Sequence, residues 1–276
     1  MTVPTITLND GNTIPQLGLG VFQVDPDEAE RIVSVALEAG YRHIDTAAAY
    51  RNEAGVGRAI AASGIPRDEI FVTTKLWNSE QGRDTARPAI EASLEKLGLD
   101  RVDLYLIHWP RPDKDLYVET WQQLETFKAE GLTRSIGVSN FQQAHLQRVL
   151  DETGTVPAIN QIELHPAFAQ RALRGFQEPL GIRTESWGPL GQGKYDLFGE
   201  KAVADAAAAH GVSPAQVVIR WHLQQGIIVF PKSSTPERIA QNVDVFGFEL
   251  SADEIAAIDG LDRNLRVGSD PDTATF

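Results

Sequence analysis

The chain has 276 residues, no cysteine and a formal net charge of −13 at neutral pH. The absence of cysteine excludes disulfides, thiolate zinc sites and a cysteine nucleophile, and the negative charge argues against nucleic acid or an anionic membrane as the main partner. No segment approaches the ~18 apolar residues that span a membrane, and residues 1–20 lack the features of a secretory signal. We therefore expect a cytoplasmic protein, and a monomer because no sustained apolar seam for self-association stands out.

The first predicted element is a β-hairpin. Residues 5–8 and 13–17 flank the sequence Asn9-Asp10-Gly11-Asn12, which is a strong turn signal. Short apolar segments separated by amphipathic stretches then recur along the chain, which is typical of strands buried on both faces of a parallel sheet. We predict these strands at residues 17–20, 43–44, 70–73, 102–107, 135–138, 158–162, 182–186 and 226–230.

Helix boundaries are marked most clearly at two places. Asp25 is a predicted N-cap, followed by Pro26 at the first helical position and Glu28 as the acid of a capping box. Gly40 ends this helix, and the Ser-Pro pair at 213–214 begins a later one.

About eight strands alternating with helices fit either a closed barrel or an open doubly wound sheet. An open dinucleotide-binding sheet normally carries G-x-G-x-x-G after its first strand. Residues 18–23 lack the third glycine, and residues 188–193 contain a proline and have the wrong spacing. We therefore predict an α/β fold of the (β/α)8 TIM-barrel type, which typically needs about 250 residues. Residues 1–276 then form a single domain, with an N-terminal β-hairpin and a C-terminal extra helix and tail.

Polar or reactive residues recur at the predicted carboxyl ends of successive strands. In a barrel, these ends meet at one rim, where the active site lies. Each residue alone has an ordinary structural explanation, such as a helix cap or a solvated charge, and only their joint position at one rim predicts a site. They are Asp45, Lys75, His108, Ser139, Asn140, Gln161 and Trp187.

Three segments resemble signatures of the aldo-keto reductase family. Residues 40–47, continued by Tyr50, Glu53 and Gly57, resemble the first signature, and residues 131–141 resemble the second. The third signature is similar to residues 231–233 together with Arg238 and Asn242. The similarity runs from about residue 5 to about residue 262, and it implies an enzyme that reduces a carbonyl group with NADPH.

The resemblance implies a catalytic tetrad of Tyr50, Asp45, Lys75 and His108. Hydride delivery to a carbonyl carbon leaves charge on the oxygen, and Tyr50 would supply the proton that neutralises it. A free tyrosine titrates near pH ~10, and we expect the Lys75 ammonium to lower the pKa of Tyr50. Asp45 would pair with Lys75, and His108 would donate a hydrogen bond to the carbonyl oxygen.

The resemblance also implies which residues bind NADPH. Ser139, Asn140 and Gln161 would hold the nicotinamide carboxamide, and Trp187 would stack on its ring. The remaining predicted cofactor-binding residues are Gly188, Leu190, Gln192 and Gly193 along the pyrophosphate, and Lys232, Ser233, Arg238 and Asn242 near the 2′-phosphate.

Residues 232–238 provide the local positive charge that an anionic cofactor needs in a chain of this net charge. Thr235 and Pro236 indicate a helix start, whose backbone N–H groups and dipole favour an anion. Lys232 and Arg238 add full charges, so we expect NADPH rather than NADH. Use of NADH stays open, because the neutral Ser234, Thr235 and Gln241 stand where some relatives carry charged residues.

Residues 185–198 and Phe230 resemble one subgroup more closely, the bacterial 2,5-diketo-D-gluconate reductases. The predicted substrate is a small polar carbonyl compound, either a keto sugar acid of that kind or a small aldehyde or ketone. The tail after Asp262 diverges from the subgroup and leaves this choice open. The predicted substrate-binding residues are Phe22, Trp77 and Trp109, with Asn78 and Arg111 as partners for a substrate carboxylate.

Two other functions compete with this one. A barrel of this family that binds NADPH but serves a regulatory or structural role is disfavoured by the intact tetrad, although the fold alone does not exclude it. A metal-dependent hydrolase is disfavoured because the six histidines include no H-E-x-x-H motif or closely spaced pair. No metal is expected.

Overall fold

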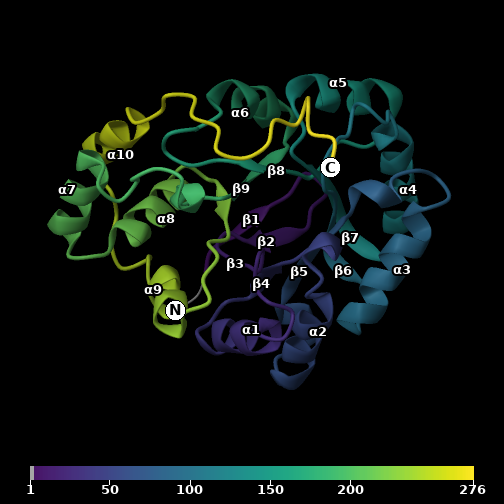
Figure 1. The fold of residues 1–276 in the computed structure, drawn as a ribbon, viewed down its shortest axis with the longest axis horizontal. Helices are drawn as coiled ribbons and strands as arrows, with labels where there is room; N and C mark the ends of the chain where they lie inside the picture. Colours follow the sequence, from purple (N-terminus) through teal and green to yellow (C-terminus); the bar gives the residue numbers. More distant parts are fainter. Residues whose placement is uncertain (1–2) are drawn as a thin grey trace.

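The structure is a computed structural model that describes residues 3–276, and Figure 1 shows its fold. The predicted hairpin is present: β1 (Thr5–Thr7) and β2 (Thr13–Pro15) pair antiparallel. Apolar side chains of the hairpin pack against those of the following strands, so the hairpin closes one end of the molecule. This cluster comprises Leu8, Ile14, Phe71, Leu104, Leu106, Ala158, Ile159 and Ile228.

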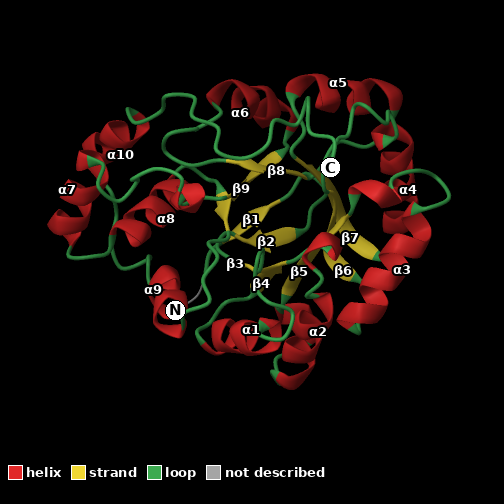
Figure 2. Cartoon of the chain, viewed as in Figure 1, coloured by secondary structure: helices red, strands yellow, loops and turns green. Residues whose placement is uncertain are grey.

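Eight parallel strands follow one another around the sheet in chain order. The prediction of a (β/α)8 fold is confirmed by this order and by the helices that surround the strands in Figure 2. The strands are β3 (Leu19–Gly20), β4 (His43–Asp45), β5 (Phe71–Leu76), β6 (Val102–Ile107), β7 (Thr133–Ser139), β8 (Ile159–Glu163), β9 (Arg183–Trp187) and β10 (Ile228–Val229).

The barrel closes where the last strand meets the first. The Val229 N–H donates to the Gln16 carbonyl at 2.9 Å, and the Gly18 N–H donates back to the Val229 carbonyl at 2.9 Å. A Cβ atom at Gly20 would lie 2.9 Å from the Phe230 carbonyl oxygen, so this seam requires glycine.

The helices form the outer layer. Their apolar faces pack on the outer surface of the strands, where Trp121, Trp221 and Phe127 are fully buried. Within residues 3–276, none of the helices has the length and apolar character needed to cross a membrane. They are α1 (Ala29–Glu38), α2 (Glu53–Ala62), α3 (Ala86–Leu97), α4 (Tyr117–Ala129), α5 (Gln143–Glu152), α6 (Arg171–Gln177), α7 (Lys201–His210), α8 (Pro214–Gln224), α9 (Pro236–Val243) and α10 (Ala252–Asp259).

The two marked helix starts have different outcomes. Ser213 caps α8 in a capping box with Gln216, as the Ser-Pro pair predicts. The predicted start of α1 at Pro26 is wrong, because the helix begins at Ala29. The Asp25 carboxylate accepts from the Asp27 N–H at 2.9 Å, which holds residues 26–28 in a separate turn. Glu28 pairs with Arg31 and does not cap the helix.

The barrel interior changes from apolar to polar along its axis. Near the hairpin it holds the apolar cluster described above. Toward the carboxyl ends of the strands it holds buried polar and ionisable side chains, namely His43, Asp45, Thr73, Lys75, Gln161 and Glu185. A polar layer inside a barrel is costly unless its groups are paired, so it points to the carboxyl ends as the functional end.

Candidate active site

A cavity of about 1340 Å³ extends across the carboxyl ends of the strands. Its lining combines side chains from β4, β7, β8 and β9 with residues of the loops that follow the strands, including those after β5 and β6. Catalytic sites of barrels gather at this rim. The predicted site residues that line the cavity are Phe22, Asp45, Tyr50, Trp77, His108, Trp109, Ser139, Asn140, Gln161, Trp187, Gly188, Leu190, Gln192 and Lys232.

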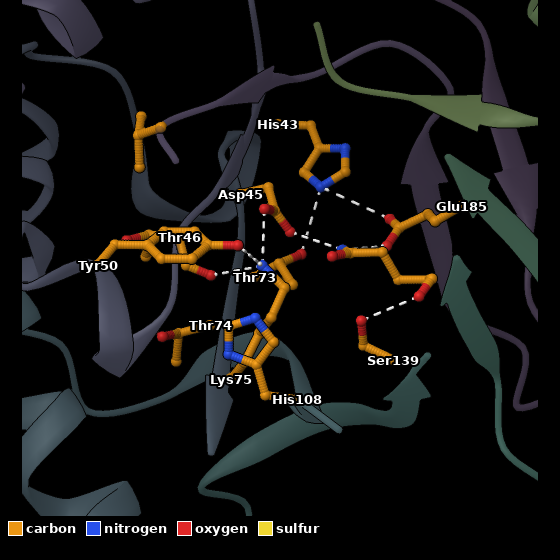
Figure 3. Close-up of polar contacts among 12 residues, drawn as sticks. His43, Asp45, Thr46, Tyr50, Thr73, Thr74, Lys75, His108, Ser139 and Glu185 are labelled. Carbon is orange, nitrogen blue, oxygen red and sulfur yellow. Dashed lines mark hydrogen bonds and ion pairs between the residues drawn. The ribbon is translucent and has the colours of Figure 1, made fainter. Parts of the chain in front are cut away.

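Lys75 is the centre of the polar cluster in Figure 3. Its ammonium lies 2.7 Å from Asp45 Oδ1, 2.8 Å from the Thr46 carbonyl oxygen and 3.4 Å from the Tyr50 hydroxyl. The side chain is 0% exposed. Burial alone disfavours the ammonium, but Asp45, Tyr50 and Glu185 together outweigh that effect, and the pKa of Lys75 is raised. The ion pair therefore keeps Lys75 charged.

Tyr50 lies in the short helix η1 (Ala48–Tyr50), which directly follows the Asp45 strand. Its ring contacts the rings of Phe22 and His108, with centroids 5.1 and 5.6 Å away. The expectation that the Lys75 ammonium lowers the pKa of Tyr50 below its ordinary value is wrong. Burial raises the pKa of Tyr50 more than the Lys75 ammonium lowers it, and the Asp45 carboxylate adds to the increase. Tyr50 is therefore a phenol near neutral pH.

His108 follows β6 and faces Tyr50 and Trp77. The ring of Trp77 lies edge-on, 5.1 Å away between centroids. Burial lowers the pKa of His108 well below its usual value, and the Lys75 charge lowers it further. A neutral imidazole donates one hydrogen bond and carries no charge. Nδ1 is buried without a hydrogen-bond partner in the described chain.

Gln161 and Glu185 make a second set of polar contacts beneath this cluster, which was not predicted from the sequence. Gln161 donates from Nε2 to Asp45 Oδ2 at 2.8 Å and to Glu185 Oε2 at 2.9 Å. Both N–H groups of this amide are thus used inside the barrel, and only its oxygen remains for the predicted nicotinamide contact. The sequence feature that could have indicated these contacts is a glutamate, Glu185, within the predicted strand 182–186.

The predicted nicotinamide residues contact one another closely. The Trp187 Nε1–H donates to Asn140 Oδ1 at 2.7 Å, and Asn140 Nδ2 donates to the His108 carbonyl at 2.9 Å. Ser139 Oγ donates to the Gln161 carbonyl at 2.9 Å. These bonds fix the Trp187 ring beside the cavity.

The predicted phosphate end is partly separated from the cavity. Lys232 lines it, whereas Gly193, Ser233, Arg238 and Asn242 do not. Ser233 and Asn242 are buried near α9, and Arg238 is exposed in the first turn of that helix. Throughout residues 3–276, neither Lys232 nor Arg238 takes part in an ion pair, so both charges remain available to an anion.

Asn78 and Arg111, the predicted partners of a substrate carboxylate, already contact other groups of the chain, and their predicted role stays a prediction. Neither residue lines the cavity. Asn78 Nδ2 donates to the Phe276 carbonyl oxygen at 2.9 Å, and Arg111 donates to the same oxygen. Arg111 also forms a bidentate pair with Asp113, with both distances 2.7 Å. The Arg111 guanidinium is thus paired with a carboxylate of its own loop.

Phe276 is a cavity residue that the sequence analysis missed. Its ring stacks on Trp77 and meets Trp109 edge-on, with centroids 6.1 and 5.1 Å away. The segment leading to it is anchored by Glu163, whose carboxylate accepts from the N–H groups of Val267 and Gly268 at 2.6 and 2.9 Å. Nothing local in the sequence shows that a residue so far from Trp77 in the chain contacts it.

The described residues 3–276 contain no group of three or more histidine, aspartate or glutamate side chains arranged to hold a metal ion. The cavity lining offers hydrogen-bonding groups, aromatic rings and the exposed Lys232 cation.

Comparisons with known proteins agree with this geometry. The Aldo/keto reductase family matches residues 15–263. An aldo-keto reductase of Mycolicibacterium smegmatis is 56% identical over 273 residues, which cover 99% of this chain and 98% of the relative. The methylglyoxal reductase DkgA of Escherichia coli strain K12 is 53% identical over 273 residues, with coverage of 99% and 98%. A crystal structure of a Gox0644 mutant in complex with NADPH has a TM-score of 0.95 and 51% identity, and 100% of both chains is covered.

Proposed function

Because the chain belongs to the aldo/keto reductase family, we propose that it reduces a carbonyl group of a small polar substrate with NADPH, and that Tyr50 is the proton donor. The observation that carries the proposal is the contact chain from the Tyr50 hydroxyl through the Lys75 ammonium to the Asp45 carboxylate, beside a neutral His108.

The cavity fits an extended dinucleotide. It runs from Asp45 and Trp187 past Gly188 and Gln192 to Lys232, so one ligand can reach from the polar cluster to the exposed cation. Gly188 has φ +61°, a conformation that favours glycine and brings backbone close to a ligand. When bound, NADPH supplies the hydride for the carbonyl carbon. The NADPH complex of the Gox0644 mutant supports this choice.

The residues of the chain supply the proton and the orientation. Tyr50 is protonated at neutral pH and donates its proton to the carbonyl oxygen as negative charge develops there. The phenolate that remains is stabilised by the Lys75 ammonium, which Asp45 holds in place. His108 donates a hydrogen bond to the same oxygen and orients the carbonyl. One positioned acid contributes about 10²- to 10⁴-fold to the rate, and positioning in the cavity supplies much of the rest.

The phosphate end favours NADPH over NADH. Lys232 and Arg238 are exposed and unpaired among the described residues, and they lie next to the N-terminus of α9. A 2′-phosphate gains both the charges and the helix dipole. NADH lacks that phosphate, so it binds more weakly but is not excluded.

A compact uncharged aldehyde or ketone, such as methylglyoxal, is the substrate we propose. Aromatic rings form the substrate wall, and Arg111 is already paired with Asp113. The name of the Escherichia coli relative supports the same class of substrate. A keto sugar acid is the second candidate, because residues 185–198 resemble the 2,5-diketo-D-gluconate reductases.

The test is NADPH oxidation by the purified protein with methylglyoxal, 2,5-diketo-D-gluconate and a simple aldehyde. We expect turnover, greatest with methylglyoxal, and we expect Tyr50→Phe to lose about 10²-fold or more of kcat. NADPH binding to both proteins is measured by the change in protein fluorescence. If the wild type binds NADPH but reduces no member of the panel, the enzymatic proposal is contradicted and a regulatory or structural barrel that binds NADPH takes its place.

A further inference from the structure

Building on the proposed function, we infer that Glu185 is a positioning residue of the active site. Its carboxyl, joined to Asp45 through the Gln161 amide, sets the charge beneath the tetrad and limits proton donation by Tyr50 at alkaline pH.

The geometry places Glu185 in the same network as the catalytic ion pair. Glu185 lies on β9 opposite Gln161 on β8, and its side chain is 0% exposed. The Gln161 amide donates one hydrogen bond to Glu185 and one to Asp45, and Figure 3 shows the side chains of Asp45 and Glu185. The two carboxyl groups thus share one amide, so a change of charge on Glu185 acts directly on Asp45.

The Lys75 ammonium compensates a negative charge on Glu185 only in part, because burial and the Asp45 carboxylate outweigh it and the pKa of Glu185 stays raised. The ionisable groups that face it are His43 and Asp45 on β4 and Lys75 on β5, while Ile228 on β10 lies opposite it in the register. His43 Nε2 is 3.9 Å from Glu185 Oε1 and 3.2 Å from Thr73 Oγ1.

The protonation states of these neighbours follow from their burial. Burial lowers the pKa of His43 to about 3, so this histidine is neutral. The Lys75 ammonium is engaged by Asp45, Thr46 and Tyr50. Burial and the neighbouring Asp45 carboxylate raise the pKa of Glu185 to about 8.

The charge of Glu185 therefore changes as pH rises through about 8. While Glu185 is neutral, Asp45 and Lys75 compensate each other. Once Glu185 ionises, a second negative charge lies in a region of low dielectric constant. Proton donation turns Tyr50 into a phenolate, which this charge disfavours. Glu185 does not line the cavity, so its ionisation lowers kcat and leaves KM almost unchanged.

The kinetic test compares kcat and KM of the wild type and Glu185→Gln between pH 6 and pH 10. We expect kcat of the wild type to fall with an apparent pKa near 8, well below the titration of Tyr50. Glu185→Gln keeps the amide-sized side chain but cannot ionise. Its kcat at pH 7 stays within about threefold of the wild type. At pH 9 its kcat exceeds that of the wild type by up to about tenfold, because one unit above the pKa the ionised carboxyl outnumbers the neutral form about tenfold.

Glu53→Gln is the matched control. Glu53 is a buried carboxylate on α2 that accepts a hydrogen bond from Thr74 at 2.6 Å and makes no hydrogen bond to Gln161 or Asp45 in the described chain. This variant keeps the decrease in kcat near pH 8. The inference is wrong if Glu185→Gln keeps the same decrease while the wild type reduces carbonyl compounds, an outcome that leaves the proposed function intact.

A second measurement does not depend on turnover. Infrared difference spectra of wild type minus Glu185→Gln report the protonated carboxyl group directly. We expect a protonated-carboxyl band at pH 7 that disappears as pH rises through about 8. A band missing at pH 7 overturns the inference even if the protein proves to have no reductase activity. If Glu185→Gln does not fold, the band is followed in spectra of the wild type at different pH values, and Glu53→Gln is expected to show the same band with the same titration.

Discussion

The ring of Phe276 lies almost parallel to the ring of Trp77, with 15° between their planes and 6.1 Å between their centroids. The last segment of the described chain thus forms part of the wall of a cavity whose other residues belong to the barrel. Phe276→Ala removes this wall. We expect KM for methylglyoxal to rise about 3- to 30-fold, in line with the loss of one aromatic contact, while the Kd for NADPH remains unchanged.

Bulkier aldehydes are the control for this prediction. Removing the Phe276 ring enlarges the cavity, so their KM rises less than that of methylglyoxal or falls. An equal rise in KM for all substrates and for the Kd of NADPH contradicts a local wall and indicates a general loss of structure.

Arg111 tests how the tail is held. Its guanidinium donates to the Phe276 carbonyl and pairs with Asp113, so Arg111→Ala releases the tail. We expect KM to rise by a similar factor for a neutral aldehyde and for a keto acid, matching Phe276→Ala. A rise in KM for the keto acid alone means that Arg111 binds the substrate carboxylate after all.

Lys75→Met separates the stability of the site from its activity. The substitution leaves the buried Asp45 carboxylate without a cation, which costs about 3–5 kcal/mol of folding stability. The double variant Lys75→Met, Asp45→Asn recovers much of this loss because no charge remains unpaired. Both variants lose about 10²-fold or more of kcat, since the phenolate of Tyr50 is no longer stabilised. Urea denaturation measures the stability, and NADPH oxidation measures the activity. Equal stability of the single and double variants contradicts the ion pair.

Glu185 also makes folding stability depend on pH. Its pKa is raised from 4.5 to about 8 in the folded chain, so the folded state binds more protons than the unfolded state between these values. Stability is therefore fully present below pH 4.5 and decreases as pH rises through 8, by up to about 5 kcal/mol for this group. We expect the stability of Glu185→Gln, measured by urea denaturation, to decrease less than that of the wild type between pH 6 and pH 9. Parallel curves contradict the raised pKa.

The barrel and the meeting of the tetrad follow from local patterns in the sequence. Apolar strands that alternate with helices predict the parallel barrel, and the barrel brings the residues after its strands to one rim. Asp45, Lys75 and His108 each end or follow a strand, so their proximity requires no knowledge of side-chain conformation. The start of α1 was missed because Asp25 caps a turn that resembles the first turn of a helix.

Burial and long-range contacts lie beyond such patterns. The direction of the Tyr50 pKa depends on how completely the cavity excludes water, which no residue spacing reveals. The Glu185–Gln161–Asp45 contacts require three side chains from different strands to point toward one another. The contact between Arg111 and the Phe276 carbonyl joins residues 165 positions apart in the chain, which no local pattern reveals.

We propose that the exposed cations beside α9 set the preference for NADPH over NADH. Lys232 and Arg238 make no ion pair within the described part of the chain, and each would donate a charge-assisted hydrogen bond to a 2′-phosphate. Lys232→Ala and Arg238→Ala are each expected to raise the Kd for NADPH about tenfold or more, while the Kd for NADH changes by less than about threefold. The loss is greatest at low salt, because salt screens exposed charges. Arg134→Ala, which removes a partly exposed cation on β7 that pairs with Asp103, is the control and leaves both values unchanged. Equal weakening of NADPH and NADH by Lys232→Ala and Arg238→Ala means that these residues bind a part common to both cofactors, and the 2′-phosphate assignment is then wrong.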